Sequence, residues 1–163
     1  MARQFQLPAQ AQIVQALNPA ADAAGRTSQY VTLKAAHKAY IICHITQGNA
    51  ATILLTPLQA QDVSGTNSKA LTNNCAIWVC TDESVTDALV KQAAAANYTT
   101  DAGVKNKVVV FEISAQDHMD EANGFKTIGL STGASNAANI TQAMFILTPL
   151  RYEQATPPSA IVN

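Results

Sequence analysis

Two similar segments constrain the fold more than any other feature of this sequence. Each consists of an apolar run, a small polar turn and a second apolar run ending in LTPL: residues 40–58 read YIICHITQGNAATILLTPL and residues 125–150 read FKTIGLSTGASNAANITQAMFILTPL. Gly and Asn in the turns tolerate the backbone conformations of tight connections. We therefore predict two β-hairpins, which pair 40–46 with 52–56 and 125–131 with 141–148. Pro57 cannot donate a ladder hydrogen bond, so it should mark a strand end or a sheet edge.

The remaining chain predicts more strands and one main helix. Alternating or β-branched runs predict strands at 30–34, 75–81 and 105–114, with Trp78 in the core or under a loop. Apolar residues at helical spacing, with Ser84 as the cap, predict a helix over residues 84–96. Ser114 followed by Asp117 predicts a second, short helical turn that stops at Asn123-Gly124. The fold class is therefore mainly β: an antiparallel β-sandwich or jelly-roll-like barrel with one short inserted helix and an extended N-terminal arm.

The two ends of the chain differ from its middle. We divide the chain into an N-terminal arm (1–29), a β-sandwich body (30–152) and an extended C-terminal tail (153–163). Pro8 could open a short helix that Asn18-Pro19 would end. The arm is too apolar for a solvated tail, so it either docks on its own body or a neighbouring subunit, or is a partly ordered terminus. If it is an assembly element, its removal should leave the body folded but weaken association. The candidate assembly contacts are Phe5, Leu7, Ile13, Val14, Leu17, Ile161 and Val162.

Composition restricts the partners. Charged residues make up 13 % of the chain and the net charge is −1, so we expect no nucleic-acid partner. Apolar runs are too short to span a bilayer and the N-terminus lacks the apolar core of a signal peptide, so we expect no membrane partner and no secretion. So few charges indicate a neutral polar surface or one covered by neighbours in an assembly.

We find no residues that predict catalysis, a cofactor or a metal site. Cys43 and His44 are adjacent in a predicted strand, so they should point to opposite faces and not act as a nucleophilic pair. Cys75 and Cys80 are too far apart along one strand to bond to each other; a bond from Cys43 to either, or between subunits, stays open, but we expect reduced thiols. The run Asp117, His118, Asp120 and Glu121 lacks the alternating oxygens and central Gly of a calcium loop, and is better interpreted as a solvated face.

A family resemblance suggests a function. The segments NPAADAAGRTSQYVTLKAAHKAYIICHITQGNAATILLTPLQA, NKVVVFEI and NGFKTIGLSTGASNAANITQAMFILTPLRY, with a short Pro-rich tail, resemble small structural proteins of tailed bacteriophages. The resemblance implies a non-enzymatic virion component, made in the host cytoplasm and placed on the capsid surface as a decoration or cement protein. Its implied partners are the major capsid protein and copies of itself. A tail or neck component is the nearest alternative.

Two further hypotheses come from other classes of protein. A carbohydrate-binding β-sandwich on the virion would be expected to expose aromatic side chains, and aromatic residues are only 6 % of this chain. A small hydrolase would need a reactive cysteine or a bound metal.

Overall fold

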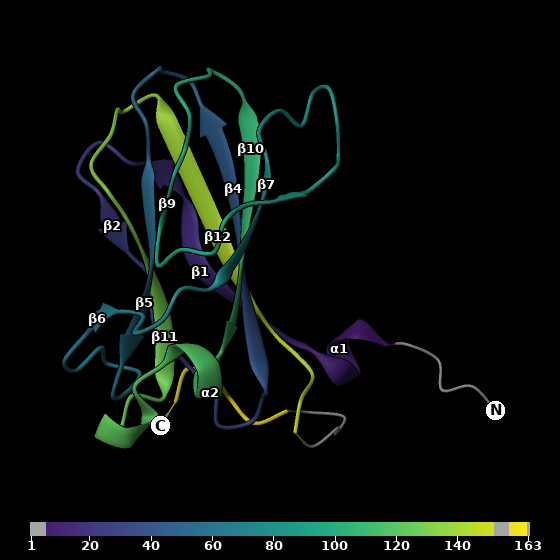
Figure 1. Ribbon diagram of the computed structural model, residues 1–163, viewed down its shortest axis with the longest axis vertical. Coiled ribbons are helices and arrows are strands. Elements are labelled where there is room, and N and C mark those ends of the chain that lie inside the picture. The colour runs from purple at the N-terminus through teal and green to yellow at the C-terminus, as the bar shows by residue number, and fades with distance from the viewer. Residues whose placement is uncertain (1–5, 152–156, 163) are drawn as a thin grey trace.

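The computed structural model describes residues 6–151 and 157–162, and it is a sandwich of two antiparallel β-sheets (Figure 1). This confirms the predicted fold class. Sheet A has the strand order β1-β12-β4-β10-β7-β8, and sheet B has the order β2-β11-β5-β6, with β3 paired to β11 and β9 paired to β5. The strands of sheet A are β1 (Gln12–Ala21), β12 (Asn139–Leu147), β4 (Lys38–Gln47), β10 (Asn106–Ser114), β7 (Ala76–Cys80) and β8 (Val90–Lys91). Those of sheet B are β2 (Arg26–Thr27), β3 (Val31–Thr32), β11 (Thr127–Thr132), β5 (Leu54–Ala60), β6 (Lys69–Ala70) and β9 (Tyr98–Thr99).

The strand order is that of a jelly roll. If β2 and β3 are taken as one interrupted strand, the eight main strands along the chain are β1, β2/β3, β4, β5, β6, β10, β11 and β12. Numbered 1 to 8 in that sequence, they lie in the order 1-8-3-6 in sheet A and 2-7-4-5 in sheet B, which is the arrangement of two nested Greek keys. Strands β7 and β8 extend sheet A beyond this set. The first and last long strands, β1 and β12, are therefore neighbours.

Alternation along each strand builds the core between the sheets. In β4, Ile41, Cys43 and Ile45 are buried, whereas Tyr40, Ile42 and His44 lie on the other face. The inner faces of the two sheets bury the large apolar side chains that stabilise the sandwich. Its largest fully buried apolar side chains are Phe111, Phe145, Ile41, Ile45, Ile53, Leu55, Ile77, Ile113, Ile128, Leu130 and Leu147.

Both predicted hairpins are wrong. Strand β4 lies in sheet A and β5 in sheet B, and β11 and β12 are divided in the same way, so each LTPL segment crosses from one sheet to the other. Strand β4 pairs with β12 and β5 with β11. Instead of a tight turn at Gly48-Asn49, the chain crosses to the other sheet with Ile53 fully buried. The Ile53 amide donates to Thr100 Oγ1 (2.9 Å), and this hydrogen bond holds the crossing segment over the end of the core.

The predicted helix over 84–96 is also wrong. Residues 84–89 lie in a loop that begins with an Asx turn, in which the Asp82 carboxylate accepts from the Ser84 amide (3.1 Å). A helix here would have no apolar surface to pack on, since Val85 is 79 % exposed. An isolated helix of this length is marginally stable in water. Val90 and Lys91 pair with β7 instead.

The other helix and strand predictions are partly confirmed. Strands β7 and β10 match the predicted strands 75–81 and 105–114, but the predicted strand 30–34 is reduced to β3. The short helix after Ser114 is confirmed as α2 (Ala115–His118), in which the Ser114 side chain accepts from the Asp117 amide. The 3₁₀ turn η1 (Glu121–Asn123) follows, and it ends at Gly124, which has a φ of 80°. Pro57 lies inside β5, but at a local edge, between the residues that pair with β9 and those that pair with β6.

The described part of the N-terminal segment belongs to sheet A. Helix α1 (Leu7–Gln10) is a single turn with Pro8 at its start, and the predicted helix that would carry Ile13, Val14 and Leu17 does not form. These three residues lie in β1, which pairs with β12 from Gln12 to Ala21. Residues 12–21 therefore dock on the protein's own body, which was one of the two docking alternatives.

Candidate functional site

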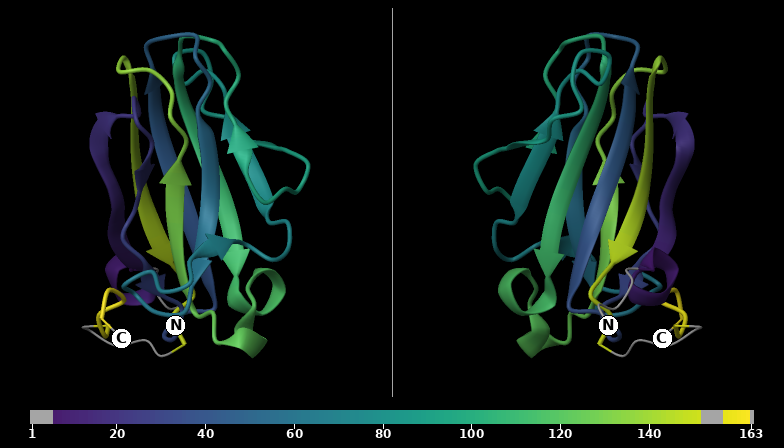
Figure 2. Two further views of the ribbon diagram at one scale, coloured as in Figure 1. Left: turned by 90° about the vertical axis from the view of Figure 1, so that its left-hand side faces the viewer. Right: turned by 90° about the vertical axis from the view of Figure 1, so that its right-hand side faces the viewer.

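The side of sheet A that faces away from the core is apolar and uncovered. Every second residue of its strands points outward, and Figure 2 (right) shows that no other element lies over these strands. We name this surface the outer apolar face. Its members are Ile13, Tyr40, Ile42, Trp78, Val108, Val110, Met144 and Ile146. Seven of these residues are half-buried by their neighbours alone, and Ile13 is 51 % exposed. Ile140 points to the same side of β12 but is separated from Met144 by Gln142, so it lies outside this face.

A continuous apolar row crosses the middle of this face. Cross-strand pairing places Met144 beside Ile42, Ile42 beside Val110 and Val110 beside Trp78. Side chains directly opposite on one face of an antiparallel pair are in contact distance. The row ends at Lys91, whose ammonium lies 5.3 Å from the centroid of the Trp78 ring.

Charges on this side of the sheet lie near its ends. Lys38 and Glu112 form an ion pair beside Tyr40, and the hydrogen bond from Lys38 to Glu112 raises the pKa of the lysine. At the other end His44 Nδ1 lies 3.5 Å from Glu83 Oε2. The face therefore has an apolar centre and a polar border, the arrangement found in protein interfaces.

A loop beside the face adds further apolar surface. Residues 81–89 project from the side of the sandwich next to β7 (Figure 1) and expose Val85 and Leu89, and Val90 of β8 is exposed beside them. The loop has a defined conformation: the Cys80 thiol donates to the Thr86 carbonyl (3.1 Å), and Asp82 binds Lys105 (2.9 Å). The hydrogen bond from Ser84, and then that from Lys105, lowers the pKa of Asp82. These exposed apolar residues thus stand on an ordered loop.

The outer side of sheet B is different, because the protein covers part of it. The ring of Tyr30 lies against Gly129, where an added Cβ would come within 2.7 Å of the ring, and against Gly65 of the neighbouring loop. The Tyr30 hydroxyl shares a short hydrogen bond (2.5 Å) with Ser68. Next to Gly129, Ser131 and Thr56 face outward in register. Part of the outer side of sheet B is therefore covered by the protein itself, whereas the outer apolar face of sheet A is not.

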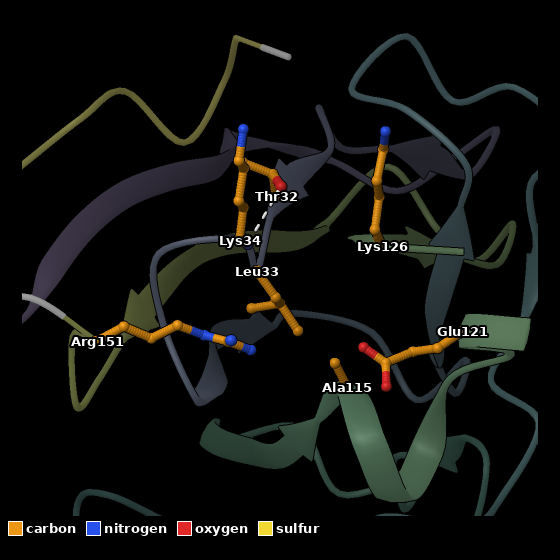
Figure 3. Close-up of a pocket in the computed structure, with 7 residues that line it drawn as sticks. All are labelled: Thr32, Leu33, Lys34, Ala115, Glu121, Lys126 and Arg151. Atoms are coloured by element: carbon orange, nitrogen blue, oxygen red, sulfur yellow. Dashed lines mark hydrogen bonds between the residues drawn. The ribbon is translucent and has the colours of Figure 1, made fainter. Parts of the chain in front are cut away.

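A pocket bordered by charged side chains lies beside helix α2, which carries Ala115 (Figure 3). Its volume is about 370 Å³, with Leu33 and Ala115 among its lining residues. Glu121 points toward Ala115, and three cationic side chains surround the pocket: Lys34, Lys126 and Arg151. All four charged side chains are exposed, and no nucleophile is paired with a base among the lining residues. The pocket therefore offers charge but no arrangement for chemistry.

Two buried ionic groups connect segments of the fold. Lys107 is 1 % exposed and donates to Gln47 Oε1 (2.8 Å), to the Gly103 carbonyl (2.7 Å) and to Asp101, through both its carbonyl and Oδ1 (2.9 Å each). It thereby connects strands β4 and β10 to the loop after β9.

The second group is at the corner between the sheets. The buried Asp22 carboxylate accepts from Arg26 Nε (3.0 Å) and Thr132 Oγ1 (2.9 Å), and Arg26 also donates to the Thr141 carbonyl (2.5 Å). The hydrogen-bond partners of Lys107 and Asp22 all belong to the fold itself, so we interpret both groups as structural; among the described residues, Asp22 Oδ2 has no hydrogen-bond partner.

The thiols are unsuited to catalysis. Cys43, Cys75 and Cys80 are free and buried, as predicted. Burial raises the pKa of Cys43 far above its ordinary value and that of Cys75 to about 11, and only a thiolate is a strong nucleophile. Cys43 is fully buried and His44 exposed, which confirms that they point to opposite faces.

The acidic run is occupied by contacts within the protein. Asp120 binds Lys69 (2.7 Å), and Asp117 accepts from Ser114 Oγ (2.5 Å). Within residues 6–151 and 157–162, no group of three or more His, Cys, Asp or Glu side chains is placed to hold a metal ion. In the same residues, no helix is long and apolar enough to cross a membrane.

The structure places the predicted assembly residues in different surroundings. Leu17 is in the core and Val14 packs against it. Ile13 joins the outer apolar face, whereas Leu7, Ile161 and Val162 are exposed near the opposite ends of the described chain, and Phe5 lies outside the described residues. Whether these residues contact a partner stays a prediction.

Most of the outer apolar face was not predicted as a site. A signal was present in the sequence, because Val108 and Val110 alternate with Val109 and Phe111 in a strand that is apolar on both faces. Such a strand is typical of a sheet that is covered on both sides. In this protein the second cover is absent from the described chain.

Comparisons with known proteins define no family for this chain. No family model and no curated protein matches it. It is similar in fold to SPBc2 prophage-derived protein YomS, with 8 % identity, coverage of 84 % of this chain and 91 % of that one, and a TM-score of 0.47. It is also similar to a chain of Desmodium yellow mottle tymovirus, with 10 % identity, coverage of 96 % and 97 %, and a TM-score of 0.33. At this level of similarity we draw no inference about activity or partners.

Proposed function

We propose that this protein is a non-enzymatic structural component of a tailed-phage virion, which decorates the capsid and stabilises it by burying surface against neighbours. The observation that carries the proposal is the outer apolar face. An ordered sheet that presents eight apolar side chains, with a polar border, is typical of a surface that is covered in an assembly. The sequence resemblance to phage structural proteins supports the same conclusion.

The size of the face predicts weak individual contacts. Five strands about 4.8 Å apart, each contributing about six residues at 3.3 Å, give an area of about 480 Å². A contact of this size buries about 960 Å² on the two partners together, which is at the low end for specific complexes. Association itself costs about 4–15 kcal/mol. A single contact is therefore marginal, and stabilisation of a shell would come from many copies bound at once.

The capsid itself would be contacted elsewhere on the molecule. Leu7, Ile161 and Val162 are exposed apolar residues in the terminal segments of the described chain. The Gln12 side chain donates to the Pro158 carbonyl (3.2 Å), so the two terminal segments contact each other. We propose these residues as capsid contacts.

Co-sedimentation with purified capsid shells tests the proposal. The wild-type protein should sediment with the shells. Ile42→Lys places a charge in the middle of the outer apolar face and would break the contacts between neighbouring copies; because many copies would then no longer bind together, association with the shells should weaken at least about tenfold. Thr56→Lys on the outer side of sheet B is the matched control and should bind like wild type. Wild-type protein that stays in the supernatant would disprove capsid decoration. Co-purification with tails instead would identify a tail component.

Carbohydrate binding is less well supported. Trp78 and Tyr40 are aromatic residues on the outer apolar face, but the row that runs from Trp78 through Val110 to Ile42 is apolar, and a sugar needs polar groups beside the ring on which it stacks. A glycan array probed with the purified protein would decide: a specific glycan competed by the free sugar would favour the carbohydrate-binding alternative.

A further inference from the structure

We propose that the outer apolar face is the interface of a homodimer, in which two copies pack sheet A against sheet A. This inference deepens the proposed function, because it names the first neighbour that the face would bury. A second copy is favoured by the edges of the sheets, by the charges on the face and by the arrangement of the apolar row.

The edges of both sheets disfavour association by strand addition. At one edge of sheet A, the pairing of β1 with β12 shifts register twice, between Gln15 and Leu17 and between Leu17 and Ala20, and Pro19 lies in the second shift. The other edge is β8, only two residues long, and the ends of the sheet B order, β2 and β6, are equally short. Bulges, Pro and short edge strands prevent another chain from extending a sheet. The faces remain as the route to association.

The charge distribution suits a second copy. Lys38 and Glu112 neutralise each other within one chain, and the central row carries no charge up to Lys91. A strongly charged partner would lose hydration over this centre and find no opposite charge there. An identical face would lose no charge hydration at its centre.

The row is complementary to itself about one particular axis. Consider a two-fold axis that lies in the interface, parallel to the strands and between β4 and β10. It places β4 over the partner's β10, and β12 over the partner's β7. It places Ile42 over the partner subunit's Val110, and Met144 over the partner subunit's Trp78, each contact occurring twice. Thioether–indole contacts are favourable. The same axis brings the projecting loop next to the partner's β1 edge, where Ile13 is the most exposed member of the face.

The interface would be small, so the dimer should dissociate on dilution. Two faces of about 480 Å² bury roughly 960 Å² in total, at the low end for specific complexes. The single tryptophan, Trp78, lies in the proposed interface and reports on it without any substitution. We expect the mass measured by light scattering to fall from dimer to monomer on dilution, with a red shift of the tryptophan emission over the same concentrations.

Charge-pairing variants test the axis. Met144→Lys and Trp78→Glu should each be monomeric, because each homodimer would bury two introduced charges in an apolar interface. An equimolar mixture of the two variants should form a heterodimer, since the introduced Lys meets the introduced Glu once and Met144 meets the partner's Trp78 once. Thr56→Lys on sheet B should dimerise like wild type. Circular dichroism and thermal melts establish that each variant is folded.

The outcomes separate this inference from the proposed function. A wild-type protein that is monomeric up to millimolar concentration overturns the dimer, even if it binds capsid shells. A dimer that survives Met144→Lys overturns the interface, and failure of the mixed variants to associate while both are folded overturns the axis. A concentration-dependent dimer that binds no shells would support this inference and disprove capsid decoration.

Discussion

The backbone amide of Asn49 donates to the side-chain oxygen of Asn139 over 2.8 Å and so joins the two crossings between the sheets. The Asn139 amide group completes the contact by donating to the Ala51 carbonyl (2.7 Å) and to Ser135 Oγ (2.9 Å). Asn139 is fully buried, and all its side-chain hydrogen-bonding groups are used. One residue thus holds together the two segments that look like independent hairpins in the sequence.

Asn139→Ala should therefore destabilise the protein. The substitution leaves the Asn49 amide and the Ala51 carbonyl without this partner, and we expect a loss of about 2–3 kcal/mol in the free energy of unfolding. Urea denaturation measures it. Asn74→Ala, at an exposed position, should change the free energy by less than about 0.5 kcal/mol. Equal effects of the two substitutions would contradict the assigned role of Asn139.

Strand β1 provides a second test, because two of its apolar residues have opposite surroundings. Leu17→Ala creates a cavity in the core and should cost about 2–4 kcal/mol, whereas Ile13→Ala should cost less than about 1 kcal/mol. Removal of residues 1–29 should unfold the body, since it deletes strands β1 and β2 and uncovers β12. The sequence alone predicted a folded body after truncation, so a cooperative, wild-type-like melt of the truncated protein would restore that view.

Lys107 should be essential to stability although it is a charged residue. Lys107→Met keeps much of the side-chain volume but removes the donors to Gln47, Asp101 and Gly103, at an expected cost of about 3 kcal/mol. Lys105→Met removes only a solvent-screened ion pair with Asp82 and should lower the melting temperature far less. Thermal denaturation of the two variants would show the difference. A similar melting temperature for both would mean that the buried network contributes little.

Acid should weaken the fold below about pH 4. Hydrogen bonds from Lys107 to Asp101 and from Lys69 to Asp120 hold the pKa values of these carboxylates below their ordinary value of 3.8. A lowered pKa in the folded state contributes stability that is present above the unfolded value and is lost as the pH falls through the folded value. Urea midpoints between pH 6 and pH 2 measure this loss. In Lys107→Met the decline should be shallower, because the pKa of Asp101 returns toward its ordinary value.

The three thiols should be protected in the native protein. At pH 8 a thiol reagent should label Cys43, Cys75 and Cys80 slowly, and all three within minutes in guanidinium, because each is buried. Val85→Cys, on the projecting loop, should add one rapidly labelled thiol. Rapid labelling of the wild-type protein would revive a reactive-cysteine hypothesis.

The sequence predicts the class of this fold better than its connections. Alternation in residues 105–114 and 75–81 predicts strands because side chains alternate between faces whatever the neighbours are, and Ser114 predicts its helical turn through a local cap. The pairing of β4 with β12 depends on contacts between residues far apart in the chain, which turn chemistry at Gly48-Asn49 cannot report. The helix expected over 84–96 failed for a related reason: its periodicity was present, but the apolar surface it needed was not.

The interaction surface was hidden from the sequence by the same lack of spatial information. The pattern of Val108 and Val110 shows that both faces of β10 are apolar, but not which face lies open. Ile13, chosen for its place near the N-terminus, does lie on that open face, whereas Leu17, chosen with it, belongs to the core.

The pairing of β1 with β12 also has a consequence for synthesis. Sheet A cannot close until the strand at the far end of the chain has left the ribosome, because β12 separates β1 from β4. Until then β1 has no place to bind, and the inner and outer sides of β4 and β10 are both open to other nascent chains. Such long-range pairing makes folding slow. Cells that produce this protein in quantity should therefore accumulate chaperone-bound or aggregated chains whenever translation terminates before residue 139.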